Sequence, residues 1–204
     1  RRFQLSVELL NYSTLNGHLR NLNLLRNYLE ETGQGSLQLD LKYERIEPVE
    51  KEVLSLYEID QLYNACSEGI PGLRERAILS LYYGCGLRSQ EGINLNVNDI
   101  LLDKQLVHVR KAKNSRARYV PFVESQQQDF ELYLRYYRSS LIRHQEEAAF
   151  LLTNQGRRMS STAVSKVSKS LIERTQNEAL QEKKPGLHTL RHSIATHLLE
   201  SGMG

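Results

Sequence analysis

The stretch HTLRHSIATHLLESG, residues 188–202, decides how the C-terminal part of this 204-residue chain folds. Side chains of a helix advance by about 100° per residue, so residues three and four apart share a face. The stretch therefore predicts one amphipathic helix, whose apolar stripe consists of Leu187, Leu190, Ile194, Ala195 and Leu198.

Arg191 stands in the middle of this stripe, with His188 and His192 along one edge. An unpaired guanidinium in an apolar setting costs several kcal/mol, so Arg191 needs a carboxylate of this chain or an anion from outside. A buried Arg–Glu pair is the simpler interpretation of a lone arginine. The neighbouring histidines and the basic residues upstream favour a bound anion.

Composition indicates a globular chain with one main domain and part of another, since 40% of residues are hydrophobic and 25% charged. The net charge of +3 permits nucleic-acid binding without demonstrating it.

Cys66 and Cys85 have neither metal-site nor disulfide spacing, so we expect the protein to work in the reducing cytoplasm. There is no signal peptide and no apolar run long enough for a membrane, so we expect no membrane association.

The pattern along the chain is mainly helical with one small β insert. Alternating residues from Asp99 to Val123 predict a small antiparallel sheet with turns near Asp103 and Asn114. Gly33 to Glu52 is polar and irregular and is predicted to be a linker. Helices are predicted over residues 1–33, over 54–66 with Ser55 as N-cap and Glu58 as its capping-box partner, over 71–84, over 126–141, and from an N-cap at Ser160 or Ser161.

Residues 84–91, GCGLRSQE, form a second motif. Its glycines allow a sharp turn that sets Arg88 at a helix N-terminus, where backbone N–H groups favour an anion. Glu91 follows one turn later and is placed to orient Arg88 or a nearby histidine. Taken alone, the motif is equally typical of a surface Arg–Glu pair.

Residues 110–118, RKAKNSRAR, are predicted to form a basic hairpin. Its cations are Arg110, Lys111, Lys113, Arg116 and Arg118. Solvated basic turns are common. A lysine at a hairpin tip can nevertheless reach a DNA groove, or protonate a leaving oxygen if neighbouring cations lower its pKa.

The chemistry of these residues points to a phosphodiester. Two arginines, a lysine and a histidine suit a phosphate that gains negative charge during reaction, because a guanidinium matches two phosphate oxygens. His188 and His192 have the spacing of a metal pair but lack a third ligand, so we expect neither metal nor other cofactor.

Taken together, GCGLRSQE, the basic hairpin and HTLRHSIATHLLESG resemble the tyrosine recombinases, or phage-type integrases, over about residues 53–204. The resemblance implies a mainly α catalytic domain with a small antiparallel β-sheet over residues 46–204, incomplete at its C-terminus. Residues 1–45 would be the C-terminal part of a helical core-binding domain that clamps DNA, plus a linker.

The resemblance also implies roles for single residues. Arg88 and Arg191 would grip the non-bridging oxygens of the scissile phosphate, His188 would assist proton transfer, and Lys113 would protonate the leaving 5′ hydroxyl. Lys113 is chosen over Lys111 by counting back from YVPF. Further roles fall to Glu91 as an organiser and His192 as support, and to Arg110, Lys111, Arg116 and Arg118 as DNA contacts.

One departure from the family is large. A nucleophilic tyrosine that forms a 3′-phosphotyrosyl bond would follow HTLRHSIATHLLESG, and the sequence reaches Gly204 without it. The chain as given is therefore expected to bind double-stranded DNA without cleaving it. We expect a homo-tetramer on DNA for a full-length protein, a monomer or weak self-association for this chain, and a cytoplasmic, nucleoid-associated location.

Two other interpretations stay open. One is a naturally truncated, non-cutting DNA-binding regulator that keeps the arginines for grip alone. The other is an unrelated helical protein with chance basic residues.

Overall fold

The computed structural model describes residues 12–38, 52–110, 116–142 and 147–203, and the chain divides into two compact units, Arg1–Glu50 and Lys51–Gly204. In the first unit the described helix is α1, Tyr12–Glu31, and the turn after it contains Gly33 at a φ of +66°. The start of the helix predicted over residues 1–33, and residues 39–51 of the predicted linker, lie outside the described residues.

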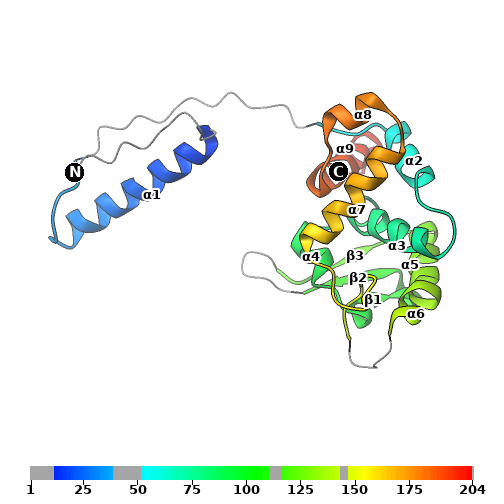
Figure 1. Cartoon of the computed structure of the whole chain (residues 1–204). Coiled ribbons are helices and arrows are strands. Elements are labelled where there is room, and N and C mark those ends of the chain that lie inside the picture. The colour runs from blue at the N-terminus through cyan, green and yellow to red at the C-terminus, as the bar shows by residue number, and fades with distance from the viewer. Residues whose placement is uncertain (1–11, 39–51, 111–115, 143–146, 204) are drawn as a thin grey trace. The chain divides into compact units, whose positions relative to one another are not determined.

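The second unit is mainly helical with a three-stranded antiparallel sheet, as expected (Figure 1). Its strands run in the order β1-β2-β3 and are β1 Ile100–Leu101, β2 Leu106–Val109 and β3 Arg118–Pro121. Its helices are α2 Leu56–Asn64, α3 Ile70–Leu79, α4 Ser89–Ile93, α5 Glu124–Leu132, α6 Ser139–Leu141, α7 Ser161–Arg174, α8 Glu178–Lys183 and α9 Leu187–Glu200.

The sheet follows the predicted alternation. Val107 and Val109 of β2 are buried, because alternate side chains of a strand point to opposite faces. The first turn lies where it was predicted, over Leu102–Lys104, and is closed by Gln105 in the left-handed conformation. The turn predicted near Asn114 lies outside the described residues.

Local signals set several helix starts. Ser55 and Glu58 form the predicted capping box of α2, and the Ser160 side chain accepts a hydrogen bond from the backbone N–H of Ala163 at the start of α7.

Two regions differ from the expected regular helices. The α3 and α5 helices continue as π-helical segments, Ser80–Gly84 and Tyr133–Arg138, which carry the buried Tyr82 and Tyr133 into the core.

The face that α9 buries differs from the predicted apolar stripe. Leu187, Leu190 and Ser193 are buried, whereas Ala195 and Leu198 are exposed. Ser193 is tolerated inside because its hydroxyl donates to the carbonyl of Thr189 (2.8 Å) and accepts from the backbone N–H of Leu54 (2.8 Å). A serine whose hydroxyl makes two hydrogen bonds thus occupies a buried position that the apolar spacing did not predict.

Candidate phosphate-binding site

Three arginines converge on one carboxylate in the second unit. Both oxygens of Glu91 accept hydrogen bonds from the guanidinium of Arg118, each at 2.8 Å. Nη1 of Arg88 donates to Oε1 of Glu91 at 3.0 Å. Nη1 of Arg191 lies 4.0 Å from Oε2 of the same carboxylate. Residues from α4, β3 and α9 therefore meet at Glu91.

The turn before α4 sets the first arginine. Gly86 adopts a φ of +57°, a conformation that L side chains rarely adopt, and an added Cβ would lie 3.2 Å from Cγ2 of Ile194 on α9. Arg88 then takes the N-cap position of α4 in an extended conformation. Its backbone N–H donates to Oε2 of Glu91 at 2.8 Å, so this N–H has an internal partner.

The helix α4 packs closely against Tyr82. A Cβ on Gly92 would lie only 2.5 Å from the hydroxyl oxygen of Tyr82. Tyr82 is fully buried, and its hydroxyl donates to the carbonyl of Ser89 at 3.2 Å. A glycine weakens a helix. Gly92 nevertheless suits this position, because the side chain of Tyr82 leaves no room for a Cβ.

The side chain of Arg191, on α9, is hydrogen-bonded to the turn before α4. Its Nη1 atom donates a hydrogen bond to the carbonyl oxygen of Gly86, which ties α9 to the turn before α4. Its side chain is 31% exposed, so solvent or a ligand can reach it. Arg191 is therefore not sealed in a buried pair with Glu91, and its binding of an outside anion stays a prediction.

The charges of the site do not balance. Glu91 is 6% exposed, and its neighbours act against the desolvation that would raise its pKa: hydrogen bonds from Arg118 and Arg88 lower the pKa to about 2. Burial lowers the pKa of Arg191, and the positive charge of Arg88 lowers it further. One carboxylate facing three guanidiniums leaves an excess of positive charge, which favours an anion.

The two histidines flank this cluster differently. His188 is exposed in the first turn of α9, one turn before Arg191, whereas His192 is half-buried. Among the described residues, the structure has no group of three or more His, Cys, Asp or Glu side chains that could hold a metal ion.

The cations of the hairpin do not form one cluster. Arg118 belongs to the Glu91 cluster, Arg116 is exposed, and Lys111 and Lys113 lie outside the described residues. Arg110 donates through Nε to Oδ1 of Asp99 at 2.9 Å. Asp99 was missed as a partner in the sequence. A local sequence feature marks this carboxylate: Asp99 follows Asn96 by three residues and accepts a hydrogen bond from its backbone N–H (2.7 Å).

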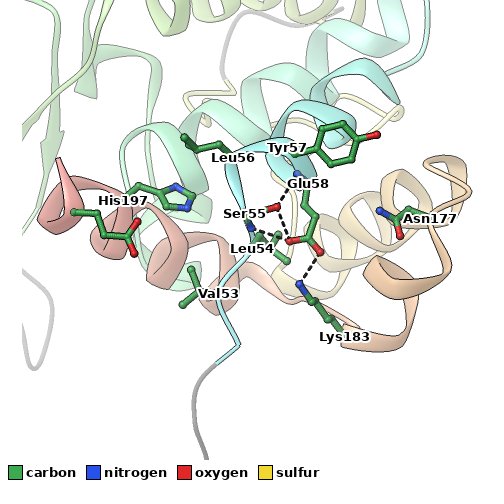
Figure 2. Close-up of a pocket in the computed structure, with 10 residues that line it drawn as sticks. Val53, Leu54, Ser55, Leu56, Tyr57, Glu58, Asn177, Lys183 and His197 are labelled. Atoms are coloured by element: carbon green, nitrogen blue, oxygen red, sulfur yellow. Dashed lines mark hydrogen bonds and ion pairs between the residues drawn. The ribbon is translucent and has the colours of Figure 1, made fainter.

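A separate pocket lies between the segment before α2, α8 and the C-terminal half of α9 (Figure 2). Its charged lining is largely neutralised internally, since Nζ of Lys183 donates to Oε1 of Glu58 at 2.6 Å. None of the residues predicted for the site lines this pocket. Among the described helices, none is long and apolar enough to cross a membrane.

Known proteins of one family are similar to this chain in sequence. The phage integrase family model matches residues 52–204. The tyrosine recombinase XerD of Oceanobacillus iheyensis is 32% identical over 193 residues, which cover 93% of this chain and 63% of the relative. The tyrosine recombinase XerA of Thermococcus kodakarensis is 33% identical, over 90% of this chain and 63% of the relative. The chain thus spans less than two thirds of the length of these curated relatives.

Solved structures share the fold. A crystal structure of XerA recombinase is 26% identical with a TM-score of 0.66, over 76% of this chain and 53% of that one. The Tn1549 transposon integrase in complex with a circular intermediate DNA has a TM-score of 0.77 at 19% identity, over 97% of this chain and 70% of that one. From the family match and the shared fold, the chain belongs to the phage integrase family, the tyrosine-type site-specific recombinases, and residues 52–204 correspond to its catalytic domain.

Proposed function

We propose that this chain is part of a site-specific recombinase that cuts and rejoins double-stranded DNA through a 3′-phosphotyrosyl intermediate. The observation that carries the proposal is the convergence of Arg88 and Arg191 on one carboxylate with excess positive charge around it. In this proposal the two guanidiniums take the non-bridging oxygens of a DNA phosphate and stabilise the charge that develops on them.

The other site residues have supporting roles in the proposal. His188, exposed beside Arg191, hydrogen-bonds the phosphate and assists proton transfer. Lys113 protonates the leaving 5′ hydroxyl, and Glu91 organises the arginines. His192 supports the residues of HTLRHSIATHLLESG, and Arg110, Lys111 and Arg116 contact the DNA backbone. No metal or other cofactor takes part.

The domain assignment is part of the same proposal. Residues 1–45 are the end of a helical domain that clamps DNA, and residues 46–204 are the catalytic domain. A full-length recombinase works as a homo-tetramer on DNA, whereas the polypeptide of residues 1–204 self-associates weakly.

Residues 1–204 by themselves are proposed to grip DNA without cutting it. Tyr82 and Tyr133 are fully buried, and burial raises the pKa of both hydroxyls. The hydroxyl of Tyr83 is paired with Nδ1 of His197 at 3.0 Å. The hydroxyl of each of these three tyrosines is thus buried or already hydrogen-bonded.

Fluorescence anisotropy with a labelled duplex tests the proposal. Arg88→Gln and Arg191→Gln should each weaken binding by about tenfold and flatten the salt dependence by roughly one unit of log–log slope. The exposed Arg135, outside the cluster, provides the control variant Arg135→Gln, which should keep the slope of the native chain. Unchanged binding in both site variants would refute a phosphate site here.

A cleavage assay separates the recombinase from a non-cutting regulator. The polypeptide that the full reading frame encodes is incubated with a nicked duplex carrying its site, and covalent protein–DNA adducts are resolved on a denaturing gel. Adduct formation that Arg191→Gln abolishes supports the recombinase. Tight binding without adduct on any site supports the regulator.

A further inference from the structure

Arg118 stands in an unusual position among the cations of the hairpin. It lies on β3, 27 residues from Glu91 in sequence, and donates through Nη1 to Oε1 and through Nη2 to Oε2, both at 2.8 Å. This two-pronged geometry is the strongest and most directional pairing that a guanidinium makes with a carboxylate. The side chain is 33% exposed and its partner 6% exposed.

The other two arginines contact Glu91 differently. Arg88 donates its backbone N–H to Oε2 at 2.8 Å and a single side-chain hydrogen bond to Oε1 at 3.0 Å, and its side chain is 53% exposed. Arg191 approaches only to 4.0 Å, beyond hydrogen-bond distance, and directs its Nη1 donor to the carbonyl of Gly86. Arg118 and Arg88 thus supply the hydrogen bonds of Glu91, and Arg191 makes only a longer ion-pair contact with it.

We propose that Arg118 is a positioning residue: by occupying both oxygens of Glu91, it keeps this carboxylate from pairing with Arg191 and leaves Arg191 and Arg88 available to a phosphate. The proposal rests on the proposed function for its phosphate, although the pairing itself is a property of the DNA-free chain. It also gives Arg118 a role other than the direct DNA contact that its place in a basic hairpin suggested.

The electrostatics of the cluster support this role. Without Arg118, the buried carboxylate of Glu91 would lose two side-chain hydrogen bonds, and the guanidinium of Arg191 already lies 4.0 Å away. Burial and the positive charges of Arg88 and Arg118 lower the pKa of Arg191, whereas Glu91 raises it, so a closer approach of Glu91 would favour the charged guanidinium. Glu91 would therefore turn from β3 toward α9 and neutralise a cation that the phosphate requires.

The first test uses the DNA-free chain of residues 1–204 and ¹⁵N NMR of arginine side chains. In Arg118→Gln, the Arg191 Nε–Hε signal should shift and its exchange with water should slow, because the guanidinium acquires Glu91 as a partner. In the double variant Arg118→Gln/Glu91→Gln this change should be absent. Unaltered Arg191 signals in Arg118→Gln, with far-UV circular dichroism showing a native fold, would overturn the proposal.

A matched control removes another arginine from the same hairpin. Arg110→Gln loses the same charge but leaves Glu91 untouched, since Arg110 pairs with Asp99. It should leave the Arg191 signals as they are in the native chain. Arg118→Lys, which offers one point charge instead of a fork, should give an intermediate change. An Arg110→Gln spectrum that changes like that of Arg118→Gln would mean a general charge effect and would contradict the proposal.

The second test measures duplex binding in a double-mutant cycle. Arg118→Gln should weaken binding about tenfold in the native background and cause no further loss in the Glu91→Gln background. An equal loss in both backgrounds would assign Arg118 a direct phosphate contact and overturn the positioning role. If the native chain binds no duplex at all, the proposed function fails, and the NMR comparison still decides whether Arg118 restrains Glu91.

Discussion

Replacing Glu91 with glutamine should destabilise the catalytic domain in a way that depends on pH. Because hydrogen bonds from Arg118 and Arg88 lower the pKa of Glu91 from 4.5 to about 2, the folded state favours the ionised carboxylate. The contribution is therefore fully present above pH 4.5 and is lost as the pH falls toward 2. Glutamine keeps an acceptor for the Arg88 backbone N–H but carries no charge.

The size of the effect follows from the same lowering of the pKa. At 1.36 kcal/mol for each tenfold change in proton affinity, it corresponds to about 3 kcal/mol. The Arg88 side chain is 53% exposed and Arg118 33% exposed, so water screens part of the attraction. We expect Glu91→Gln to lower the free energy of unfolding by about 2 kcal/mol at pH 7.

Urea unfolding measures this difference, followed by tyrosine fluorescence because the chain contains no tryptophan. The gap between the native chain and Glu91→Gln should be largest at pH 7 and should narrow steadily between pH 5 and pH 2.5. Glu173→Gln provides the control, since Glu173 is 61% exposed and its pair with Lys169 spans 3.9 Å on the surface. That change should cost less than about 0.5 kcal/mol. A gap for Glu91→Gln that is constant over this pH range would refute the reasoning.

Two further substitutions test the packing that holds the site. Gly92→Ala places a Cβ 2.5 Å from the hydroxyl oxygen of the buried Tyr82 and should lower the free energy of unfolding in urea by about 1–3 kcal/mol. The control Gly17→Ala, with no atom within 4 Å of the added Cβ, should not lower it. A Gly92→Ala urea midpoint equal to that of the native chain would contradict the packing. Ser193→Ala leaves the buried backbone N–H of Leu54 without its acceptor and should cost about 1–3 kcal/mol, with faster hydrogen exchange at Leu54; native-like exchange would show that this bond is dispensable.

Sequence determined the features that depend on neighbours along the chain. The Ser55–Glu58 capping box, the Ser160 N-cap and the alternation around Val107 each involve residues a few positions apart, and local backbone geometry fixes how they interact. The Arg88–Glu91 pair belongs to the same class, since three residues make one helical turn. The two motifs and their order were also sufficient to indicate the family.

Only the tertiary structure decided which partners the distant residues take. Arg118 and Glu91 are 27 residues apart, Arg191 and Gly86 are 105 apart, and Ser193 and Leu54 are 139 apart. A periodic pattern predicts which face of a helix is apolar, but it carries no information about which polar atom lies opposite. The spacing therefore did not predict Ser193 on the buried face, nor Glu91 as the partner of Arg118. Its pairing with Glu91 exists because packing brings β3, α4 and α9 to one point, where a buried carboxylate requires donors.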